Sequence, residues 1–411
     1  MMQENETLKQ LFQKEFSKIV AVISKQFGLQ HIEIAEDIVS ETFLQALETW
    51  KNKGTPANPT AWIYKVAQRK TLYHFRRGKI FEQKIVPNLK STQEKNDEIS
   101  SLDFSPQNIK DSQLQMLFAV CNPTIAGEAQ IGLALRILCG FSIDEIAEAF
   151  LSNEETIKKR LFRAKEKLRA SKVKMELPPE KEIEQRLDNV LHIIYLLFTE
   201  GYYSKTQNEV LRKDFCLEAM RLCLQLTDYK KTNLPKTNAL LALMCFHSSR
   251  FRARLASDDT YILYENQNQE LWDPALIKQG THFLLLSATG NDLSSYHVEA
   301  RIASLHCQKE DSKKKWEKIL HLYNQLLFLN YSPAVALNRT FALYKVYGAQ
   351  AALAEAEKLK LDSNYYYFIL MGELYKNIDH KNAKANFLKA YSLARTITDK
   401  QALQTKIDSL L

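Results

Sequence analysis

Glycine and proline are scarce in this sequence, with 11 and 10 residues among 411. Tight turns and β-hairpins depend on these two residues, so a β-rich or Rossmann architecture is not expected. Leu, Ala, Lys, Glu and Gln dominate instead, and these residues favour helices. The length allows two or three domains with proper cores. We therefore expect an all-α fold.

Long apolar runs are missing as well. The opening residues MMQENETLKQ are polar and lack the apolar core of a secretory signal. No run reaches the roughly 18 apolar residues that a membrane-crossing helix needs. We therefore expect a cytoplasmic protein with no signal peptide and no membrane contact.

Cysteine and histidine are few and poorly placed for chemistry. The six cysteines form no CxxC pair and lie in apolar helical contexts, so we expect reduced thiols in the core. His297 and His306 are nine residues apart, with no carboxylate or thiol at ligand spacing. P-loop and GxSxG motifs are also missing. The sequence predicts no metal, no cofactor and no enzyme activity.

Positive charge, in contrast, is concentrated in two segments. Residues 60–84 carry seven Lys or Arg against one Glu, a net charge of +6, and residues 156–174 carry nine against one, a net charge of +8. The whole chain is only +8, so all other residues together sum to −6. Charge gathered in this way is typical of a surface that binds nucleic acid.

Four parts follow one another along the chain. Residues 8–84 are predicted to form a first helical unit, and the polar, aperiodic residues 85–108 are typical of a flexible linker. A second unit covers 109–174. The Pro178-Pro179 pair marks the boundary before a nearly neutral helical part at 183–411.

Within the first unit, an acidic helix should precede the basic one. It would cover about 32–50 and end at the Gly/Pro/Asn loop 51–59, after which Thr60 can cap the basic helix. Its predicted buried side consists of Ile34, Ile38, Phe43, Leu47 and Trp50. Its carboxylates are Glu33, Glu36, Asp37, Glu41 and Glu48. Such a face is usually only solvated, but beside a DNA-binding helix it suits a basic protein partner.

The second unit contains a helix-turn-helix pattern over 142–169. Ser142 with Glu145, and Ser152 with Glu155, form two capping boxes ten residues apart. In the second helix the predicted buried stripe is Ile157, Leu161, Ala164 and Leu168. The outward face then carries Thr156, Lys159, Arg160, Arg163 and Lys167, which suits entry into a major groove. A solvated basic helix in a bundle is the alternative.

The first basic helix alternates aromatic and cationic residues. Its aromatic and imidazole rings are Trp62, Tyr64, Tyr73, His74 and Phe75, and its cations include Lys65, Arg69, Lys70, Arg76 and Arg77. Proteins that bind single strands combine stacking rings with cations in this way. The alternative is that several of the rings belong to the core.

The C-terminal part holds a possible repeat. Residues 365–394 place small and aromatic residues near the positions typical of a tetratricopeptide-type helix pair, namely Leu370, Gly372, Tyr375, Ala383, Phe387 and Ala390. Residues 334–360 look like a degenerate preceding unit. A plain helical hairpin is the alternative.

Several of these segments together resemble a known family. EDIVSETFLQALETW and NPTAWIYKVAQRKTLYHFRR resemble region 2 of a bacterial group IV (extracytoplasmic-function) sigma factor, and 117–169 resembles its region 4. Further segments resemble the subgroup with a long C-terminal tetratricopeptide-like extension, and these are 186–204, 240–255, 264–273 and 332–353. The resemblance implies a subunit that binds core RNA polymerase and directs promoter-specific initiation without covalent chemistry.

The resemblance also implies roles for residues. The acidic helix would dock on the β′ clamp helices of polymerase through Asp37, Glu41, Phe43 and Gln45, and region 4 would face the β flap. The −10 element would be captured and held by Asn58, Trp62, Lys65, Arg69, Lys70, Arg76 and Arg77. The −35 element would be read by the helix beginning near Asn153, through Asn153, Thr156, Lys159, Arg160, Arg163 and Lys167. The linker would run toward the polymerase active site.

Two other classes of protein compete with this interpretation. A one-component helix-turn-helix regulator with a ligand- or protein-binding helical domain would need one duplex-binding module, which leaves the first basic helix without a role. A repeat scaffold with no DNA role would not explain either basic helix. For the extension, we expect an in-cis regulatory module that could also bind a regulatory protein. An interaction domain without effect on initiation is the alternative.

Overall fold

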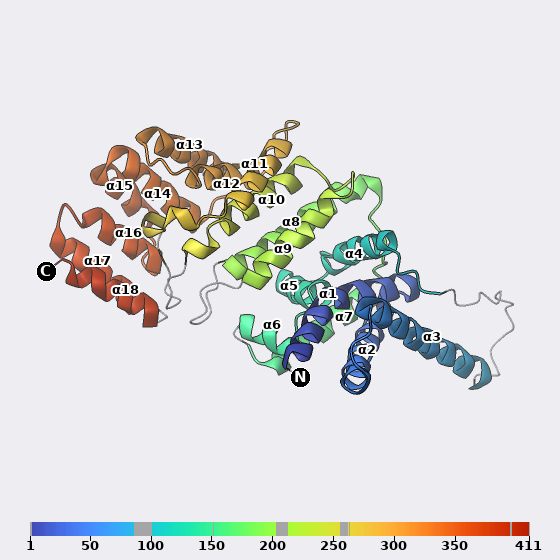
Figure 1. Ribbon diagram of the computed structural model, residues 1–411. Helices are drawn as coiled ribbons and strands as arrows, with labels where there is room; N and C mark the ends of the chain where they lie inside the picture. The colour runs from blue at the N-terminus through green and yellow to red at the C-terminus, as the bar shows by residue number, and fades with distance from the viewer. Residues whose placement is uncertain are drawn as a thin grey trace. The chain divides into compact units, whose positions relative to one another are not determined.

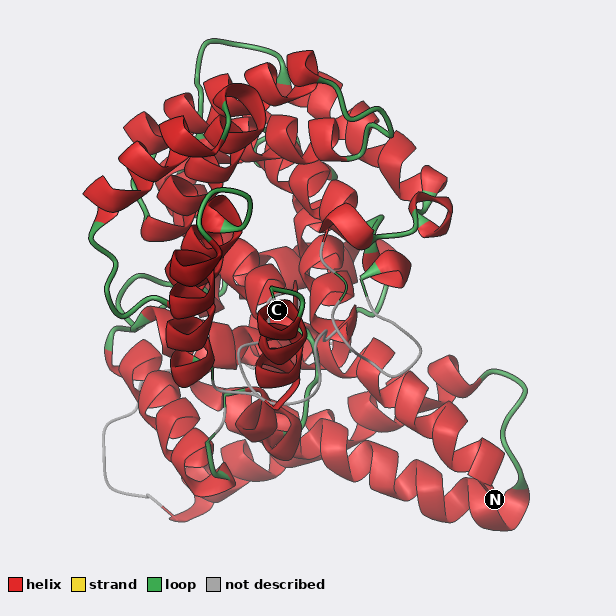
Figure 2. Ribbon diagram, turned by 90° about the vertical axis from the view of Figure 1, so that its left-hand side faces the viewer, coloured by secondary structure: helices red, strands yellow, loops and turns green. Residues whose placement is uncertain are grey.

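The computed structural model describes residues 2–85, 101–150, 152–202, 213–254, 262, 264–394 and 397–410. Throughout these residues the chain forms helices and connecting loops, with no β-strand (Figures 1 and 2). The expected all-α fold is therefore confirmed. The helices group into two compact units, 1–196 and 197–411.

The first unit contains eight α-helices in the described residues, the last of which continues into the second unit. They are α1 (Met2–Phe27), α2 (Ile32–Lys53), α3 (Pro59–Ile85), α4 (Pro106–Val120), α5 (Gly127–Leu133), α6 (Ile143–Ala149), α7 (Glu154–Ala170) and α8 (Glu180–Tyr202). A π-helical turn, Ala134–Leu138, extends α5, and a short 3-10 turn, Leu29–His31, precedes α2.

The core of this unit is built around α1, which is apolar on several sides. Phe16, Ile19, Val20 and Ile23 of α1 are fully buried, as the helical spacing predicts. The aromatic rings of Phe12 (α1) and Phe43 (α2) meet edge to face at 5.0 Å, and Gln113 of α4 donates a hydrogen bond to Ser17 at 3.3 Å. The two halves predicted at 8–84 and 109–174 thus share one unit.

The predicted buried side of α2 needs two corrections. Ile34 is only half-buried, and Leu47 is 43% exposed. The unpredicted neighbour Leu44 is 60% exposed, whereas Ile38, Phe43 and Trp50 are buried as expected. Small residues take the place of Leu47, because Ala35, Ala46 and Thr42 pack fully into the core. Helical spacing alone did not reveal that the buried face of α2 is turned away from Leu47, because leucine occurs on both faces of this helix.

Part of the predicted linker is ordered. Leu102 is buried, its carbonyl accepts a hydrogen bond from Gln68 of α3 at 3.3 Å, and the ring of Phe104 stacks on Tyr64 at 4.7 Å. Ser105 then caps α4. The sequence prediction of a flexible linker over 85–108 is therefore wrong for 101–108, because two apolar residues anchor it to α3. Residues 86–100 lie outside the described residues.

Helix α8 shifts the expected boundary before the C-terminal part. Arg186 donates a hydrogen bond to the carbonyl of Phe118 at 2.8 Å, and Asn189 donates to the carbonyl of Cys121 and to Gln130, the latter at 2.9 Å. These carbonyls end α4, where helical carbonyls lack partners of their own. The division between the units therefore falls inside α8, near 196, rather than at the predicted residue 183.

The second unit continues the helical chain to the C-terminus. Its helices are α9 (Lys213–Thr227), α10 (Pro235–Ser248), α11 (Pro274–Ser287), α12 (Ser295–His306), α13 (Lys313–Leu329), α14 (Pro333–Tyr347), α15 (Ala349–Ala356), α16 (Tyr365–Tyr375), α17 (His380–Leu393) and α18 (Ile397–Asp408). The described part of this unit also contains four short 3-10 turns, Phe251–Ala253, Tyr264–Asn266, Gln269–Leu271 and Glu357–Leu359.

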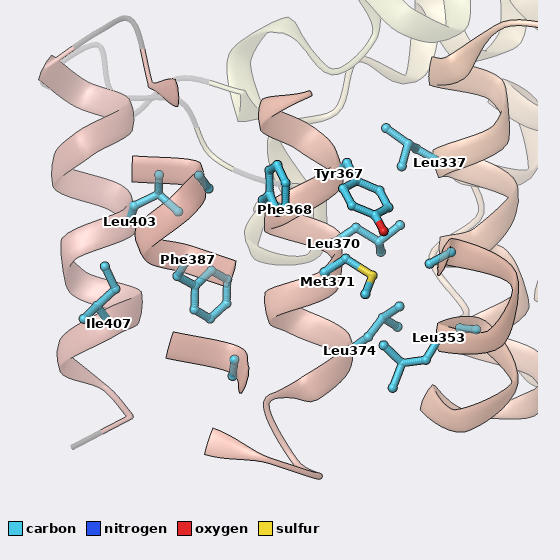
Figure 3. Packing of buried hydrophobic residues seen from close by; sticks show 14 of the residues in the cluster. Leu337, Leu353, Tyr367, Phe368, Leu370, Met371, Leu374, Phe387, Leu403 and Ile407 are labelled. Atoms are coloured by element: carbon cyan, nitrogen blue, oxygen red, sulfur yellow. The ribbon is translucent and has the colours of Figure 1, made fainter. Parts of the chain in front are cut away.

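The predicted repeat is a helix pair, α16 and α17. A Cβ atom at Gly372 would lie 2.5 Å from the ring of Phe387, so glycine is needed for this close approach. Phe387, Leu370, Leu403 and Leu353 belong to one buried cluster, in which helices α15 to α18 take part (Figure 3). The preceding unit predicted at 334–360 corresponds to α14 and α15.

Candidate nucleic-acid interface

The second basic helix, α7, has an N-cap and a buried apolar stripe, so its opposite face is left to solvent. Ile157, Leu161, Ala164 and Leu168 are all buried, as predicted. The turn before it differs from the prediction, because Asn153 rather than Ser152 is the N-cap and accepts a hydrogen bond from the amide of Thr156 at 2.8 Å.

The preceding helix, α6, begins with the predicted capping box. The amide of Ser142 donates to Glu145 at 2.8 Å, and the amide of Glu145 donates to the Ser142 hydroxyl at 3.4 Å. Two capped helices therefore enclose a tight turn, the local geometry that a helix-turn-helix requires.

The outward face of α7 is the one that the sequence predicts. Exposed on it are Asn153, Thr156, Lys159, Arg163 and Lys167. Arg160 is half-buried, because it pairs with Glu128 of α5 at 3.3 Å and its guanidinium lies 5.7 Å from the Phe150 ring centroid. Arg163 is therefore better presented to a duplex than Arg160.

A groove of about 1010 Å³ runs between α2 and α3. Among the described residues, its wall contains five cations and no carboxylate, and it includes most of the cations predicted on the first basic helix. The lining residues that matter here are Gln45, Thr49, Lys53, Trp62, Lys65, Arg69, Tyr73, Arg76 and Arg77. A groove lined by cations and rings fits the backbone and bases of a single strand.

Only two of the predicted aromatic rings take part in this groove. Trp62 lies edge to face with Trp50 at 5.5 Å, and Tyr73 is 67% exposed. Phe75 instead stacks on Phe27 of α1 at 3.8 Å, and Tyr64 donates to Glu15 at 2.5 Å. Burial, followed by this hydrogen bond, raises the pKa of Tyr64. For Tyr64 and Phe75 the core alternative is therefore correct.

Asn58 has a structural role at the start of α3. Its side-chain oxygen accepts a hydrogen bond from the amide of Ala61 at 3.0 Å, and its carbonyl accepts one from Trp62 at 3.2 Å. Asn58, not Thr60, therefore caps the first basic helix, with Pro59 as its first residue. Asn58 is exposed.

Polymerase-docking residues predicted on α2 fall into three environments. Asp37 and Glu41 are exposed, and Gln45 is half-buried in the groove wall. Phe43 is only 5% exposed and packs on Phe12, so its predicted contact with a partner is wrong: the ring belongs to the core. Partial burial, and next the carboxylates of Glu36 and Glu41, raise the pKa of Asp37.

Sequence reasoning missed the apolar part of this surface. Leu44 and Leu47 are exposed on the same helix as Asp37 and Glu41. Residues 37, 41 and 44 follow the i, i+4, i+7 spacing that puts side chains on one helical face. This spacing in the sequence was the signal that could have revealed the apolar part of the surface. The face therefore combines carboxylates with leucines and suits a partner with cations around an apolar patch.

Comparison with protein families assigns both halves of the first unit. Residues 11–80 match sigma-70 region 2, and residues 133–168 match sigma-70 region 4. The chain belongs to the sigma-70 family. It has the regions of an extracytoplasmic-function-like sigma factor and a long C-terminal extension, in which residues 186–288 match a family of unknown function, DUF6596. The region 2 match accounts for the first basic helix, which would have no role in a one-component regulator.

One relative covers nearly all of this sigma factor. A protein of Rhizobium meliloti (strain 1021), described as uncharacterized, is 32% identical over 387 residues, which are 93% of this chain and 91% of the relative. The shared length includes the extension as well as the two sigma regions. No solved structure matches the chain.

Sigma regions 2 and 4 bind core RNA polymerase and promoter DNA in transcription initiation, and sigma-factor families are not enzymes. Within the described residues, no cluster of three or more His, Cys, Asp or Glu could hold a metal ion. No helix in those residues is long and apolar enough to cross a membrane. All six cysteines are described, and none forms a disulfide. Burial raises the pKa of Cys121 to about 12.

Proposed function

We propose that this sigma factor holds the opened −10 strand in the groove between α2 and α3. The observation that carries the proposal is the composition of the groove wall, whose described residues combine five cations with Trp62 and Tyr73 and include no carboxylate. Phosphates would meet the cations while unstacked bases meet the rings, and each stacked base contributes about 1–3 kcal/mol. Asn58, at the start of α3, would contact a flipped base.

The test is transcription in vitro with core polymerase on two templates, one fully paired and one melted over the −10 element. Tyr73→Ala removes an exposed ring and should preserve the fold. It should reduce initiation on the paired template more than on the melted one, because strand capture assists melting. Lys51→Ala, an exposed change on α2 outside the groove wall, is the matched control. If Tyr73→Ala were equally active on both templates, the Tyr73 ring would have no role in strand capture.

The −35 element is read, in this proposal, by the exposed face of α7. Asn153 would keep its cap while its neighbours Thr156 and Lys159 meet the groove edge, and Arg163 and Lys167 would contact bases or phosphates. Lys159 pairs with Glu155 at 2.6 Å, but both side chains are exposed and the pair can exchange with phosphate at little cost. Region 4 would contact the β flap of polymerase through a different surface.

Polymerase docking is assigned to the exposed face of α2. Asp37 and Glu41 would pair with cations of the β′ clamp helices, and Leu44 and Leu47 would cover apolar surface beside them. The carboxylates lie four residues apart on one face. This arrangement suits a polar rim around a small apolar centre, the usual anatomy of a protein interface.

The extension is proposed to regulate initiation in cis, and to offer a surface to a regulatory protein. Its helix pairs are the kind of stacked surface that binds peptides or proteins, and exposed rings such as Phe328, Tyr331 and Tyr366 are available on it. Truncation after Leu196 keeps Arg186 and Asn189 on α4, so it removes the second unit without stripping region 4. Truncation after Leu361 removes only α16 to α18.

Both truncated proteins should be compared with the full chain in promoter-dependent transcription. A regulatory extension changes initiation in at least one of them, and an equal change in both places the surface on α16 to α18, which both truncations remove. Unchanged initiation from both would leave an interaction domain without effect on transcription.

A further inference from the structure

The turn that joins α4 to α5 is held together by a residue of the extension. Asn189 of α8 donates one hydrogen bond to the carbonyl of Cys121, at the end of α4, and another to the side-chain oxygen of Gln130 on α5 at 2.9 Å. Both hydrogens of one amide group are used in this way. A single side chain therefore joins the two helices on either side of the turn. We call Asn189, Cys121 and Gln130 the Asn189 junction.

Gln130 extends this junction into the turn itself. Its side chain is buried, and its amide nitrogen donates to the carbonyls of Asn122 at 2.9 Å and Ile125 at 2.8 Å. These two bonds use both hydrogens of the Gln130 amide, so its oxygen is left as the acceptor for Asn189. The N-terminus of α5 has no side-chain cap of its own. The junction therefore fixes where α5 begins and how it is oriented.

The residues of α8 that make these contacts belong to the extension and not to the region 4 match. Arg186, three residues before Asn189 on the same helical face, donates to the carbonyl of Phe118 at 2.8 Å. The region 4 match ends at 168, and the DUF6596 match begins at 186. The start of the DUF6596 segment thus binds both sides of a turn in the helical domain that contains α7.

Helix α5 is the support on which α7 rests. At Gly132 the two helices approach so closely that a Cβ atom would lie 3.3 Å from Leu161, a member of the buried stripe of α7. Glu128 of α5 also pairs with Arg160 of α7 at 3.3 Å. Gln130 lies between these two contacts along α5. Because close-packed interiors transmit small displacements, a change in the orientation of α5 changes the direction of the exposed face of α7.

Recognition of base edges is sensitive to such a change, whereas contact with phosphates is not. A bidentate contact to a base needs donor–acceptor distances of about 2.7–3.2 Å and a fixed direction. Lysine side chains reach phosphates through a flexible stem, and phosphate contacts carry no sequence information directly. Loss of the Asn189 junction is therefore expected to lower sequence preference more than overall affinity for DNA.

We propose that Asn189 is a positioning residue for −35 recognition. The start of the DUF6596 segment holds α5 at the Asn189 junction, and α5 sets the orientation in which α7 presents its exposed face to the duplex. The inference rests on the proposed reading of the −35 element by α7. It gives the first helix of a family of unknown function a role in DNA reading. Asn189 acts through Gln130 and α5, and its own donors are already used within the protein.

The experiment uses the full chain bound to core polymerase. Selection of bound duplexes from a randomised promoter library provides a preferred −35 sequence. A second duplex carries the same −10 element with that −35 sequence scrambled. The affinity for each duplex is measured by titration at one salt concentration, because salt changes both affinities. The specificity ratio is the affinity for the preferred duplex divided by the affinity for the scrambled one.

Asn189→Ala should lower the specificity ratio at least about fivefold, the lower end of what one bidentate base contact contributes. Affinity for the scrambled duplex should stay unchanged, because phosphate contacts and the −10 element remain. Gln130→Ala should lower the ratio to the same extent. The double variant should lower it no further than either single change, since both residues act through one junction.

A matched control separates positioning from loss of stability. Gln113→Ala also removes a buried amide side chain, but the hydrogen bond of Gln113 is made to Ser17 of α1 at 3.3 Å. It should lower the melting temperature to a similar extent, because it too leaves a buried partner without its hydrogen bond. Its specificity ratio should equal that of the unmodified chain. If Asn189→Ala does not fold, Asn189→Ser replaces it, because serine has a single donor for the two acceptors.

The outcomes separate the inference from the proposed function. An unchanged ratio in folded Asn189→Ala, together with a lowered ratio in Arg163→Ala, overturns the positioning role of Asn189 and leaves the reading by α7 intact. An equal fall in Gln113→Ala assigns the effect to stability and overturns the inference as well. Failure of both Asn189 variants to fold makes the junction a requirement of the fold, which also overturns it. An unchanged ratio in Arg163→Ala overturns the proposed reading by α7, and the inference falls with it.

Discussion

The carboxylate of Glu41 on α2 lies 3.0 Å from the ammonium of Lys70 on α3. The first residue is proposed to meet polymerase, and the sequence predicts that the second meets DNA, so the two proposed binding surfaces of region 2 would be adjacent and share a contact. Glu41 is 62% exposed and Lys70 is 26% exposed. An exposed pair of this kind contributes about 0.2–1 kcal/mol. Binding of either partner can therefore replace it.

The carboxylates of α2 should be needed for polymerase binding and not for folding. Asp37→Lys combined with Glu41→Lys reverses the charge of the proposed docking face, and we expect the double variant to lose co-purification with core polymerase. Its melting temperature should change little, because both side chains are exposed. The matched control is Glu182→Lys, a charge reversal at an exposed carboxylate of α8, away from the proposed docking face. A folded double variant that still co-purifies would exclude this docking face.

Arg163 should contribute directly to −35 recognition. Arg163→Ala removes an exposed side chain from the outward face of α7, and a good bidentate base contact is worth about 1–3 kcal/mol, or roughly 5- to 150-fold in affinity. Promoter-dependent transcription should fall by that order while polymerase binding stays normal. Arg160→Ala should also disturb α5 through Glu128. Unchanged −35 preference in Arg163→Ala would mean that another face of α7 is used.

Region 4 should depend on the first helix of the extension. Asn189→Ala removes hydrogen bonds to the Cys121 carbonyl and to Gln130, in a part-buried site. Leaving buried partners without hydrogen bonds costs about 1–3 kcal/mol. We expect the free energy of unfolding of the first unit to fall by this order in chemical denaturation. For the same reason a chain that ends at Lys174 should have an unstable region 4, whereas one that ends at Leu196 should not.

The approach of α16 to α17 should tolerate no side chain at Gly372. An added Cβ would lie 2.5 Å from the Phe387 ring, and overpacking of this kind costs about 1–3 kcal/mol. Gly372→Ala should therefore lower the stability of the second unit, and Phe387→Leu should partly relieve the strain. Gly127→Ala, where a Cβ meets nothing within 4 Å, is the control. Equal melting of the Gly372 and Gly127 variants would contradict the packing shown in Figure 3.

The raised pKa of Asp37 has a consequence for stability. A carboxyl whose pKa is higher in the folded chain than in the unfolded chain binds its proton more tightly when folded, so its ionised form opposes folding at neutral pH. Asp37→Asn should then raise the melting temperature at neutral pH. The gain should shrink as the pH falls toward the ordinary aspartate pKa of 3.8. Because Asp37 is exposed, the effect should be small. If the difference in melting temperature between Asp37→Asn and the unmodified chain did not change over this pH range, ionisation of Asp37 would not be its cause.

The sequence predicts the helices and the faces of α7 closely, because both depend on local periodicity. Ile157, Leu161, Ala164 and Leu168 recur at helical spacing and are all buried, and Arg163 follows as exposed. The charge of α3 is likewise a property of its sequence. The matches to regions 2 and 4 of sigma-70 agree with the motifs that carried the resemblance.

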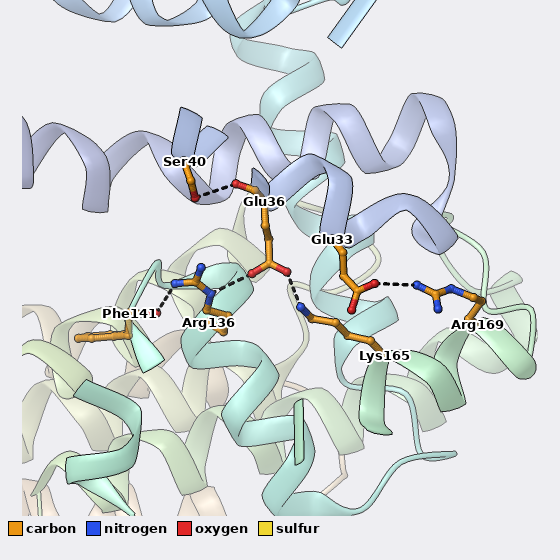
Figure 4. Close-up of polar contacts among 7 residues, drawn as sticks. All are labelled: Glu33, Glu36, Ser40, Arg136, Phe141, Lys165 and Arg169. Atoms are coloured by element: carbon orange, nitrogen blue, oxygen red, sulfur yellow. Dashed lines mark hydrogen bonds and ion pairs between the residues drawn. The ribbon is translucent and has the colours of Figure 1, made fainter. Parts of the chain in front are cut away.

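Only the tertiary structure decided which of these residues meet one another. Nothing in the local pattern distinguishes the buried carboxylate of Glu36 from the exposed carboxylate of Asp37. The partners of Glu36 are Arg136 and Lys165, which lie 100 and 129 positions away in the sequence (Figure 4). The same holds for Phe43, which is buried in the core, and for Asn189, which donates a hydrogen bond at the end of a helix of region 4. Local spacing fixes the faces of a helix, whereas long-range packing chooses the partner of each face.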